Sequence, residues 1–199
     1  IPLRVEGYFQ AMNILCATGL AVASGSPSEI VFEHLKDLRP ITGRLEFCGK
    51  NNNEAKIYVD YAHTPDALTA ALFSLRELTE KEIILVFGCG GNRDSIKRTI
   101  MGEIAENFSD KVVITDDNPR DENPKKIRSQ IKSKIGKKKL IEIPSRRSAI
   151  SKAIYSLKSG DILLVAGKGH EKFQQYGSKK IIFFDKFKIN QPIKNKRIN

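Results

Sequence analysis

The sequence has few cysteines, no tryptophan and no long apolar run. Its three cysteines, Cys16, Cys48 and Cys89, are an odd number without close spacing, which argues against a disulfide framework and against a cysteine-based zinc site. The longest apolar runs, such as 83–87 and 162–166, hold about five residues, whereas a membrane span needs about twenty. We therefore expect no membrane span and a reducing, cytoplasmic setting.

Positive charge is abundant. Among 199 residues, 34 are Lys or Arg and 23 are Asp or Glu, a formal net charge of +11, while 40% hydrophobic residues are enough for a globular core. The balance favours anionic partners, which include nucleic acid, nucleotide phosphates and carboxylate-rich substrates. The start at Ile1-Pro2 is neither an initiator methionine nor a signal segment, so we expect it to be cut or processed.

The hydrophobic period alternates between strand and helix from residue 45 onward. Strands are expected at 45–47, 57–60, 83–87, 111–115, 140–143 and 161–166, and helices at 65–78, 99–108, 124–135 and after Ser145. This alternation predicts an α/β fold, with a mostly parallel sheet covered by helices on both faces. Two further helices, at 9–23 and 28–38, precede a linker near Pro40, and a basic tail is expected at 186–199.

Ligands of such sheets bind in the loops at the carboxyl ends of the strands, here 60–65, 88–98, 116–120 and 167–171. The glycine loop at 88–91 departs from a dinucleotide fingerprint at Arg93, and the chain contains no P-loop sequence. Its backbone amides could still hold carboxylate or phosphate oxygens beside Arg93. A tight structural turn is the alternative.

The stretch from Asp116 to Arg120 suits a zwitterion. An arginine can grip a carboxylate with two hydrogen bonds, aspartate can take an ammonium group, and Asn118 can serve either, while Pro119 fixes the loop. A capped turn would contain the same residue types. The sequence leaves both open.

Histidines are too scattered to predict a metal site. His63 lies close to Asp60 at one strand end, where it could act on a ligand or be a hydrogen-bonded structural residue. His170 adjoins Glu171, with no second ligand at metal spacing. We assign no metal ligand and no catalytic residue.

A basic stretch at 125–139 holds eight Lys or Arg and no acid. No aromatic side chain is interleaved for base stacking, and an isoleucine stripe occupies one face of the expected helix. A solvated helix face therefore explains this stretch better than a nucleic-acid groove does.

Four motifs in the same order resemble the Mur ligase family: DYAHTPDAL at 60–68, FGCGGNRD at 87–94, DDNPR at 116–120 and AGKGHE at 166–171. The resemblance implies an ATP- and Mg²⁺-dependent ligase of peptidoglycan synthesis. Such an enzyme adds meso-diaminopimelate to UDP-N-acetylmuramoyl-L-alanyl-D-glutamate through an acyl phosphate.

The resemblance also implies domains. Residues 1–40 would be the end of the central ATP-binding domain, and 41–185 would be the C-terminal Rossmann-like domain that binds the amino acid. The P-loop and most of the magnesium site belong to a portion that this sequence lacks, so we expect no ligase activity from the chain alone.

Individual residues take roles by the same resemblance. Those matching meso-diaminopimelate contacts are Arg93, Asp117, Asn118, Pro119, Arg120, Gly167 and Glu171. Those matching nucleotide contacts are Asn13, Arg44, Asp60 and His63, while Gln10 stands where the family has a further asparagine. The alternatives are a lysine-adding Mur ligase, a folylpolyglutamate-type ligase, and a non-catalytic module that binds anions through its basic surface.

Overall fold

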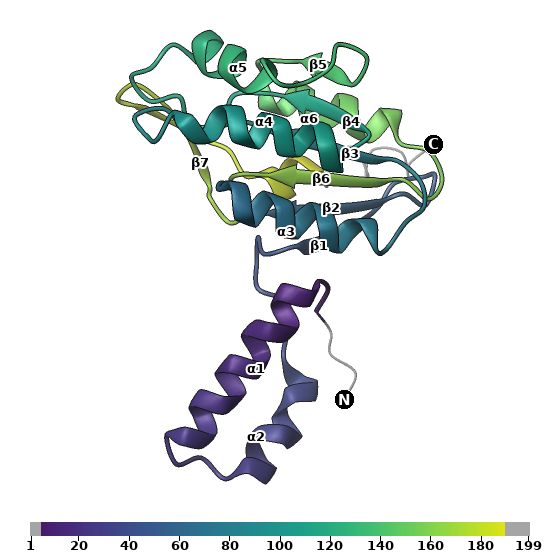
Figure 1. Ribbon diagram of the computed structural model, residues 1–199, viewed down its shortest axis with the longest axis vertical. Helices are drawn as coiled ribbons and strands as arrows, with labels where there is room; N and C mark the ends of the chain where they lie inside the picture. Colours follow the sequence, from purple (N-terminus) through teal and green to yellow (C-terminus); the bar gives the residue numbers. More distant parts are fainter. Residues whose placement is uncertain (1–4, 190–199) are drawn as a thin grey trace. The chain divides into compact units, whose positions relative to one another are not determined.

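The computed structural model describes residues 5–189 and divides the chain into two units (Figure 1). The first unit ends at Ile41 and the second begins at Thr42.

The N-terminal unit is a pair of helices. Helix α1 spans Tyr8–Ala23 and α2 spans Ser28–His34, followed by a 3₁₀ turn, η1, at Leu35–Asp37. Both expected helices are therefore present. The 3₁₀ turn ends before Leu38, which has extended backbone shortly ahead of Pro40. No helix in the described part of the chain is long and apolar enough to cross a membrane.

The C-terminal unit is built on a six-stranded sheet in the order β1-β2-β6-β3-β4-β5. The strands are β1 Glu46–Lys50, β2 Lys56–Asp60, β3 Ile83–Phe87, β4 Lys111–Ile114, β5 Leu140–Glu142 and β6 Ile162–Ala166. Only β1 at one edge pairs antiparallel, and the other five strands are parallel. The predicted α/β class and mostly parallel sheet are confirmed.

Helices cover both faces of this sheet. Their bounds are α3 Pro65–Arg76, α4 Ile96–Phe108, α5 Pro124–Lys132 and α6 Arg146–Ser156. The connections through α3, α4 and α5 advance towards β5, whereas α6 returns the chain from β5 to β6. Because such crossovers are right-handed, the returning helix lies on the opposite face, as Figure 1 shows for α3 and α4 against α6.

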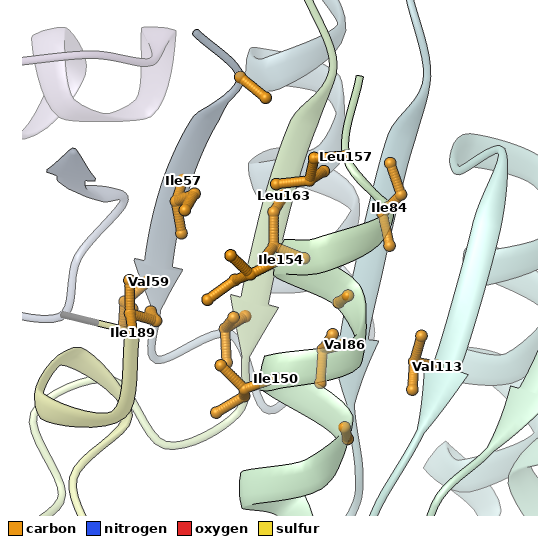
Figure 2. Close-up of a cluster of buried hydrophobic side chains, with 14 of the residues drawn as sticks. Ile57, Val59, Ile84, Val86, Val113, Ile150, Ile154, Leu157, Leu163 and Ile189 are labelled. Atoms are coloured by element: carbon orange, nitrogen blue, oxygen red, sulfur yellow. The ribbon is translucent and has the colours of Figure 1, made fainter. Parts of the chain in front are cut away.

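One core lies between α6 and the sheet (Figure 2). Alternate strand residues such as Ile57, Val86 and Leu163 face Ile150 and Ile154 of α6. The strand residues between them, including Leu85 and Phe87, are equally buried and face the other helix layer. Burial of β3 and β6 on both faces explains why these strands are apolar at every position.

Polar caps fix where the helices begin. The Thr64 hydroxyl accepts a hydrogen bond from the Ala67 amide at 3.4 Å, and Pro65 occupies the first turn of α3. Ser145 caps α6 as predicted, accepting from the Ser148 amide at 3.4 Å. These caps place the preceding loops at the carboxyl edge of the sheet.

A second, two-stranded sheet had no counterpart among the expected elements. Strands β7, Phe173–Tyr176, and β8, Lys179–Ile182, form an antiparallel hairpin, and Gly177 in its turn has φ +54°. Beyond it, Ile189 is fully buried in the core with α6, so the packed part extends past the boundary expected at residue 186. The rest of the expected tail, 190–199, lies outside the described residues.

The contact between α4 and α5 predicts an unusual effect of a helical glycine. A Cβ at Gly102 would lie 2.1 Å from the Ile131 carbonyl oxygen, a backbone atom that cannot move freely. Although alanine normally favours a helix over glycine, we expect Gly102→Ala to lower the free energy of unfolding by about 2 kcal/mol, because the core is overpacked. Urea denaturation measures this. Gly19→Ala in α1, where a Cβ meets nothing within 4 Å, is the control, and an equally stable Gly102→Ala chain would contradict the packing.

Candidate functional site

The four loops singled out from the sequence follow β2, β3, β4 and β6 and lie side by side at the carboxyl edge of the sheet. The Gly167 amide donates to the Asp60 carbonyl at 3.1 Å, and the Thr115 amide donates to the Phe87 carbonyl at 3.0 Å. The loops are thus joined in pairs by their backbones, and their side chains can act on one ligand.

Asp116 anchors its loop. Its carboxylate pairs with the Arg128 guanidinium and accepts from the Tyr176 hydroxyl at 3.0 Å, and its carbonyl accepts from Gln174 at 3.0 Å. Burial and the neighbouring Asp116 carboxylate raise the pKa of the Tyr176 hydroxyl. With both carboxylate oxygens engaged, Asp116 is structural, and the acid available for a ligand is Asp117.

Asp117 is buried, and one of its carboxylate oxygens accepts no hydrogen bond within residues 5–189. Its Oδ2 has no hydrogen-bond partner among residues 5–189, and a Cβ at Gly167, which has φ +109°, would lie 2.9 Å from that oxygen. Burial raises the pKa of Asp117, while the positive charges of Arg146 and Lys168 oppose the rise. A buried carboxylate oxygen that accepts no hydrogen bond is costly to a fold, which makes Asp117 a candidate for binding a ligand.

Lys168 joins Asn118 to Glu171. The fully buried Lys168 ammonium donates to Asn118 Oδ1 at 3.0 Å and to Glu171 Oε2 at 2.8 Å, and Asn118 Nδ2 donates to the same Glu171 oxygen at 2.8 Å. Partial burial acts to raise the pKa of Glu171, but the hydrogen bonds and charge of Lys168 hold it below its usual value. These contacts fix the Asn118 amide and an ionised Glu171.

Arg120 lies against the glycine loop. Its backbone has φ +52°, and its Nη1 donates to the Gly91 carbonyl at 2.6 Å. A Cβ at Gly91 would lie 1.8 Å from the Pro119 carbonyl oxygen, so glycine is required where the two loops meet. The glycine loop is therefore a tight structural turn that also positions Arg120.

Arg93, on the same loop, is exposed and makes no hydrogen bond or ion pair within residues 5–189. Its loop is held by Glu122, which accepts from the Asn92 amide at 2.5 Å and from two nitrogens of the buried Arg98 at 2.8 Å each. Arg98 also donates to the Gly90 carbonyl at 3.0 Å. The backbone of the loop that carries Arg93 is therefore fixed by hydrogen bonds, while the Arg93 side chain is exposed.

The Arg98–Glu122 pair predicts an acid-sensitive contribution to stability. Hydrogen bonds from Arg98 and from the Asn92 amide lower the pKa of Glu122 to about 2. Since the folded value lies below the unfolded value of about 4.3, the contribution is complete above pH 4.3 and disappears as pH falls towards 2.

We therefore expect Glu122→Gln to be less stable than the unaltered chain at pH 7, and this deficit to shrink between about pH 4 and pH 2. Urea midpoints across that range measure the change. Glu80→Gln, at an exposed acid, is the matched control. A deficit that stayed constant with pH would contradict the role of the ion pair.

Three of the residues matched to nucleotide contacts lie together. The Asp60 carboxylate accepts from the Leu45 amide at 2.5 Å and from the Ala62 amide at 2.6 Å. The Arg44 guanidinium lies 4.9 Å from the centre of the Tyr61 ring, and the His63 ring lies 4.5 Å from it. Arg44 and His63 are exposed around this tyrosine, whereas Asp60 is buried and shapes the backbone.

The remaining nucleotide candidate, Asn13, is an exposed residue of α1 in the N-terminal unit. It lines a groove between α1 and α2 of about 700 Å³. Residues 5–189 contain no cluster of three or more histidine, cysteine, aspartate or glutamate side chains that could hold a metal ion.

The basic stretch at 125–139 is only partly a solvated face. Its isoleucines at 127, 131 and 135 are buried as predicted. Arg128, however, is also buried, and donates through Nε to Glu142 at 2.9 Å besides pairing with Asp116. Arg128 is therefore a buried residue that holds Asp116 in place, and is not part of a solvated face.

Lys168, Arg146 and Asp185 were not among the predicted site residues. Lys168 stands inside a quoted motif, but Arg146 and Asp185 are 39 residues apart, and nothing in the sequence pairs them. With Asp117 and Glu171 they form what we call the charge cluster: Arg146, Lys168, Asp117, Glu171 and Asp185.

The charge cluster has three carboxylates and two cations, and so carries one uncompensated negative charge when all are ionised. One incoming ammonium group would balance it. Arg120, two residues after Asn118, supplies a guanidinium for a carboxylate. The arrangement therefore suits a ligand that carries an ammonium and a carboxylate close together.

Comparison with known proteins identifies the family of this chain. The family model described as the glutamate ligase domain of Mur ligases matches residues 43–169 of this chain. A UDP-N-acetylmuramoyl-L-alanyl-D-glutamate–2,6-diaminopimelate ligase of Chelativorans is 45% identical over 98% of this chain, and that of Bradyrhizobium diazoefficiens is 49% identical over 93%. The chain spans 40% and 38% of these two relatives.

A solved structure of a ligase of the same name covers the whole chain, with a TM-score of 0.76 and 32% identity, and the chain covers 41% of it. The expected resemblance is confirmed by sequence and by fold. The chain belongs to the Mur ligase family, and its six-stranded unit carries the glutamate ligase domain of that family.

Proposed function

We propose that this chain supplies the part of an ATP-dependent ligase that binds meso-diaminopimelate. The complete enzyme would join this amino acid to UDP-N-acetylmuramoyl-L-alanyl-D-glutamate during peptidoglycan synthesis, in the cytoplasm. Relatives bearing the corresponding name match nearly the whole chain, which spans about 40% of their length.

The observation that supports the proposal is a charge cluster with one excess carboxylate next to an arginine with unused donors. Asp117 Oδ2 accepts no hydrogen bond within residues 5–189, and the Arg120 guanidinium donates from one nitrogen to Gly91 and to no other acceptor among them. Meso-diaminopimelate has an ammonium and a carboxylate at each end. Lysine lacks the second carboxylate and would leave the arginine unpaired.

In this proposal the protein positions the amino acid for attack on the activated substrate. Asp117, Asn118 and Glu171 hold the ammonium of one end, and Arg120 with Arg93 holds its carboxylate. The amino group of the other end is then the nucleophile, and holding it in line lowers the entropic part of the barrier. ATP, with Mg²⁺, would supply the activation of the acceptor carboxylate.

Nucleotide contacts from this chain are also part of the proposal. Arg44 and His63 flank Tyr61 on an exposed surface, where they could reach the phosphates of ATP, and Asp60 fixes the backbone beneath them. Asn13 is proposed to contact the adenine. The described residues offer no set of metal ligands, so we assign magnesium no residue here.

Titration of isotope-labelled chain with meso-diaminopimelate, followed by amide chemical shifts, tests the proposal. We expect saturable changes in the loops at 116–120 and 167–171, with none along the basic stretch at 125–139. Double-stranded DNA is the comparison ligand, because a basic binding module would respond along that stretch in a salt-dependent way. Changes only with DNA would overturn the proposal, and equal changes with lysine would favour a lysine-adding ligase.

A further inference from the structure

Arg146 is a fully buried arginine in the first turn of α6. Its Nε and Nη2 donate to the two carboxylate oxygens of Asp185 at 2.8 Å and 2.7 Å, and Nη2 also donates to the Ala166 carbonyl at 2.9 Å. Asp185 is fully buried as well. The guanidinium is therefore held on one side by a two-point grip and by the end of β6.

The third nitrogen of this guanidinium, Nη1, lies on the side of Asp117. Arg146 Nη1 is buried without a hydrogen-bond partner among residues 5–189, and it lies 3.9 Å from Asp117 Oδ2, which is equally without one. This distance is too long for a hydrogen bond but short for two opposite charges in a buried setting. The Arg146 guanidinium and the Asp117 carboxylate therefore attract each other but form no hydrogen bond.

We propose that Arg146, gripped by Asp185, is a positioning residue that lies against the buried Oδ2 of Asp117 and keeps this carboxylate charged for the ammonium group of the incoming amino acid. The inference rests on the proposed function, in which Asp117 takes that ammonium. Asp185 has an equal part in it, because its grip holds the guanidinium back. Without Asp185, Arg146 would be free to bond Asp117 directly and to neutralise its charge.

Several charged or titratable groups face Asp117 from the elements packed around it: Arg146 from α6, Lys168 and Glu171 from the loop after β6, Asp185 from the C-terminal segment, and Cys89 from the glycine loop. Burial raises the pKa of Asp117, and Arg146 is the strongest opposing influence, followed by Lys168. Glu171 and Asp185 act in the same direction as burial. Loss of the Arg146 charge would therefore move the protonation of Asp117 to higher pH.

The test uses the double variant Arg146→Gln with Asp185→Asn, which removes both charges of the pair, so that neither partner is left charged without the other. Arg146→Lys keeps the charge and loses the planar grip, and it serves as the rescue variant. Arg147→Gln removes an exposed arginine from the next position of α6 and is the matched control. Carbon-13 titration of the Asp117 carboxyl and calorimetry with meso-diaminopimelate are measured for each from pH 5 to pH 8.

We expect the double variant to raise the Asp117 titration midpoint by at least about one pH unit, and meso-diaminopimelate affinity to fall about tenfold at the acidic end while changing little at pH 8. Arg146→Lys should restore most of the midpoint, and Arg147→Gln should match the unaltered chain. An unchanged midpoint, or an affinity loss that is the same at every pH, would overturn the inference.

The two proposals fail in different ways. If the unaltered chain bound no meso-diaminopimelate at any pH, the proposed function would be lost, and the Asp117 titration alone would decide whether Arg146 keeps this carboxyl ionised. If binding were intact but insensitive to the double variant, the proposed function would stand and the role of Arg146 would be wrong.

Discussion

Replacing Asp117 by asparagine is expected to weaken the binding of meso-diaminopimelate to this chain about a hundredfold, or about 2.7 kcal/mol. The substitution keeps the shape of the side chain and removes its charge. The ligand's ammonium would then face an amide beside the cations Arg146 and Lys168, with no carboxylate to offset them at that point. Calorimetry at pH 7.5 measures the loss.

The same substitution should not destabilise the fold. Asp117 is buried with an oxygen that accepts no hydrogen bond within the described residues, and the charge cluster carries one more carboxylate than it has cations. Neutralising that carboxylate removes an uncompensated buried charge. A thermal midpoint equal to or above that of the unaltered chain is therefore expected, and a strongly lowered one would assign Asp117 to structure instead of to ligand binding.

Replacing Arg120 by alanine is expected to lower the affinity for meso-diaminopimelate at least tenfold, or about 1.4 kcal/mol, and in a complete ligase to lower kcat/KM by a similar factor. The guanidinium has donors not used by Gly91 and acts electrostatically on Glu171 of the charge cluster, and a lysine ligand has no second carboxylate to accept a two-point bond from it. Discrimination against lysine should shrink with it, because the penalty of an unpaired arginine disappears.

Two comparisons separate this effect from a general loss of charge or of loop structure. Arg147→Ala removes one positive charge from an exposed position and should leave binding unchanged. Arg120→Lys keeps the charge without the planar pair of donors and should recover only part of the affinity. Unchanged affinity in Arg120→Ala would contradict its assignment to the ligand carboxylate.

Much of the fold could be predicted because local patterns agree with it. The apolar run at 83–87 predicts the bounds of β3 to the residue, since burial on both faces leaves no polar position in this strand. Pro65 and Ser145 marked the starts of α3 and α6 because a proline in the first turn and a hydroxyl cap are purely local signals. The loops at the carboxyl edge followed from the parallel topology alone.

The contacts that hold the site residues in place could not be predicted from local sequence patterns. The β7–β8 hairpin is short and largely polar, yet its Gln174 and Tyr176 fix Asp116. Asp116 and Asp117 are identical in type and adjacent, and only their three-dimensional neighbours distinguish them, because Asp116 accepts from Tyr176 whereas Asp117 Oδ2 accepts no hydrogen bond within residues 5–189. The Arg146–Asp185 pair depends on a contact between α6 and the C-terminal segment, which no local pattern reveals.

Calorimetry of this chain with meso-diaminopimelate and, separately, with L-lysine tests whether it binds the amino acid that we propose. We expect saturable binding of one meso-diaminopimelate per chain, with affinity at least about tenfold above that for lysine, because only the former engages both the Asp117 carboxylate and the Arg120 guanidinium. Equal affinity for the two, or no saturable binding of meso-diaminopimelate, would contradict it.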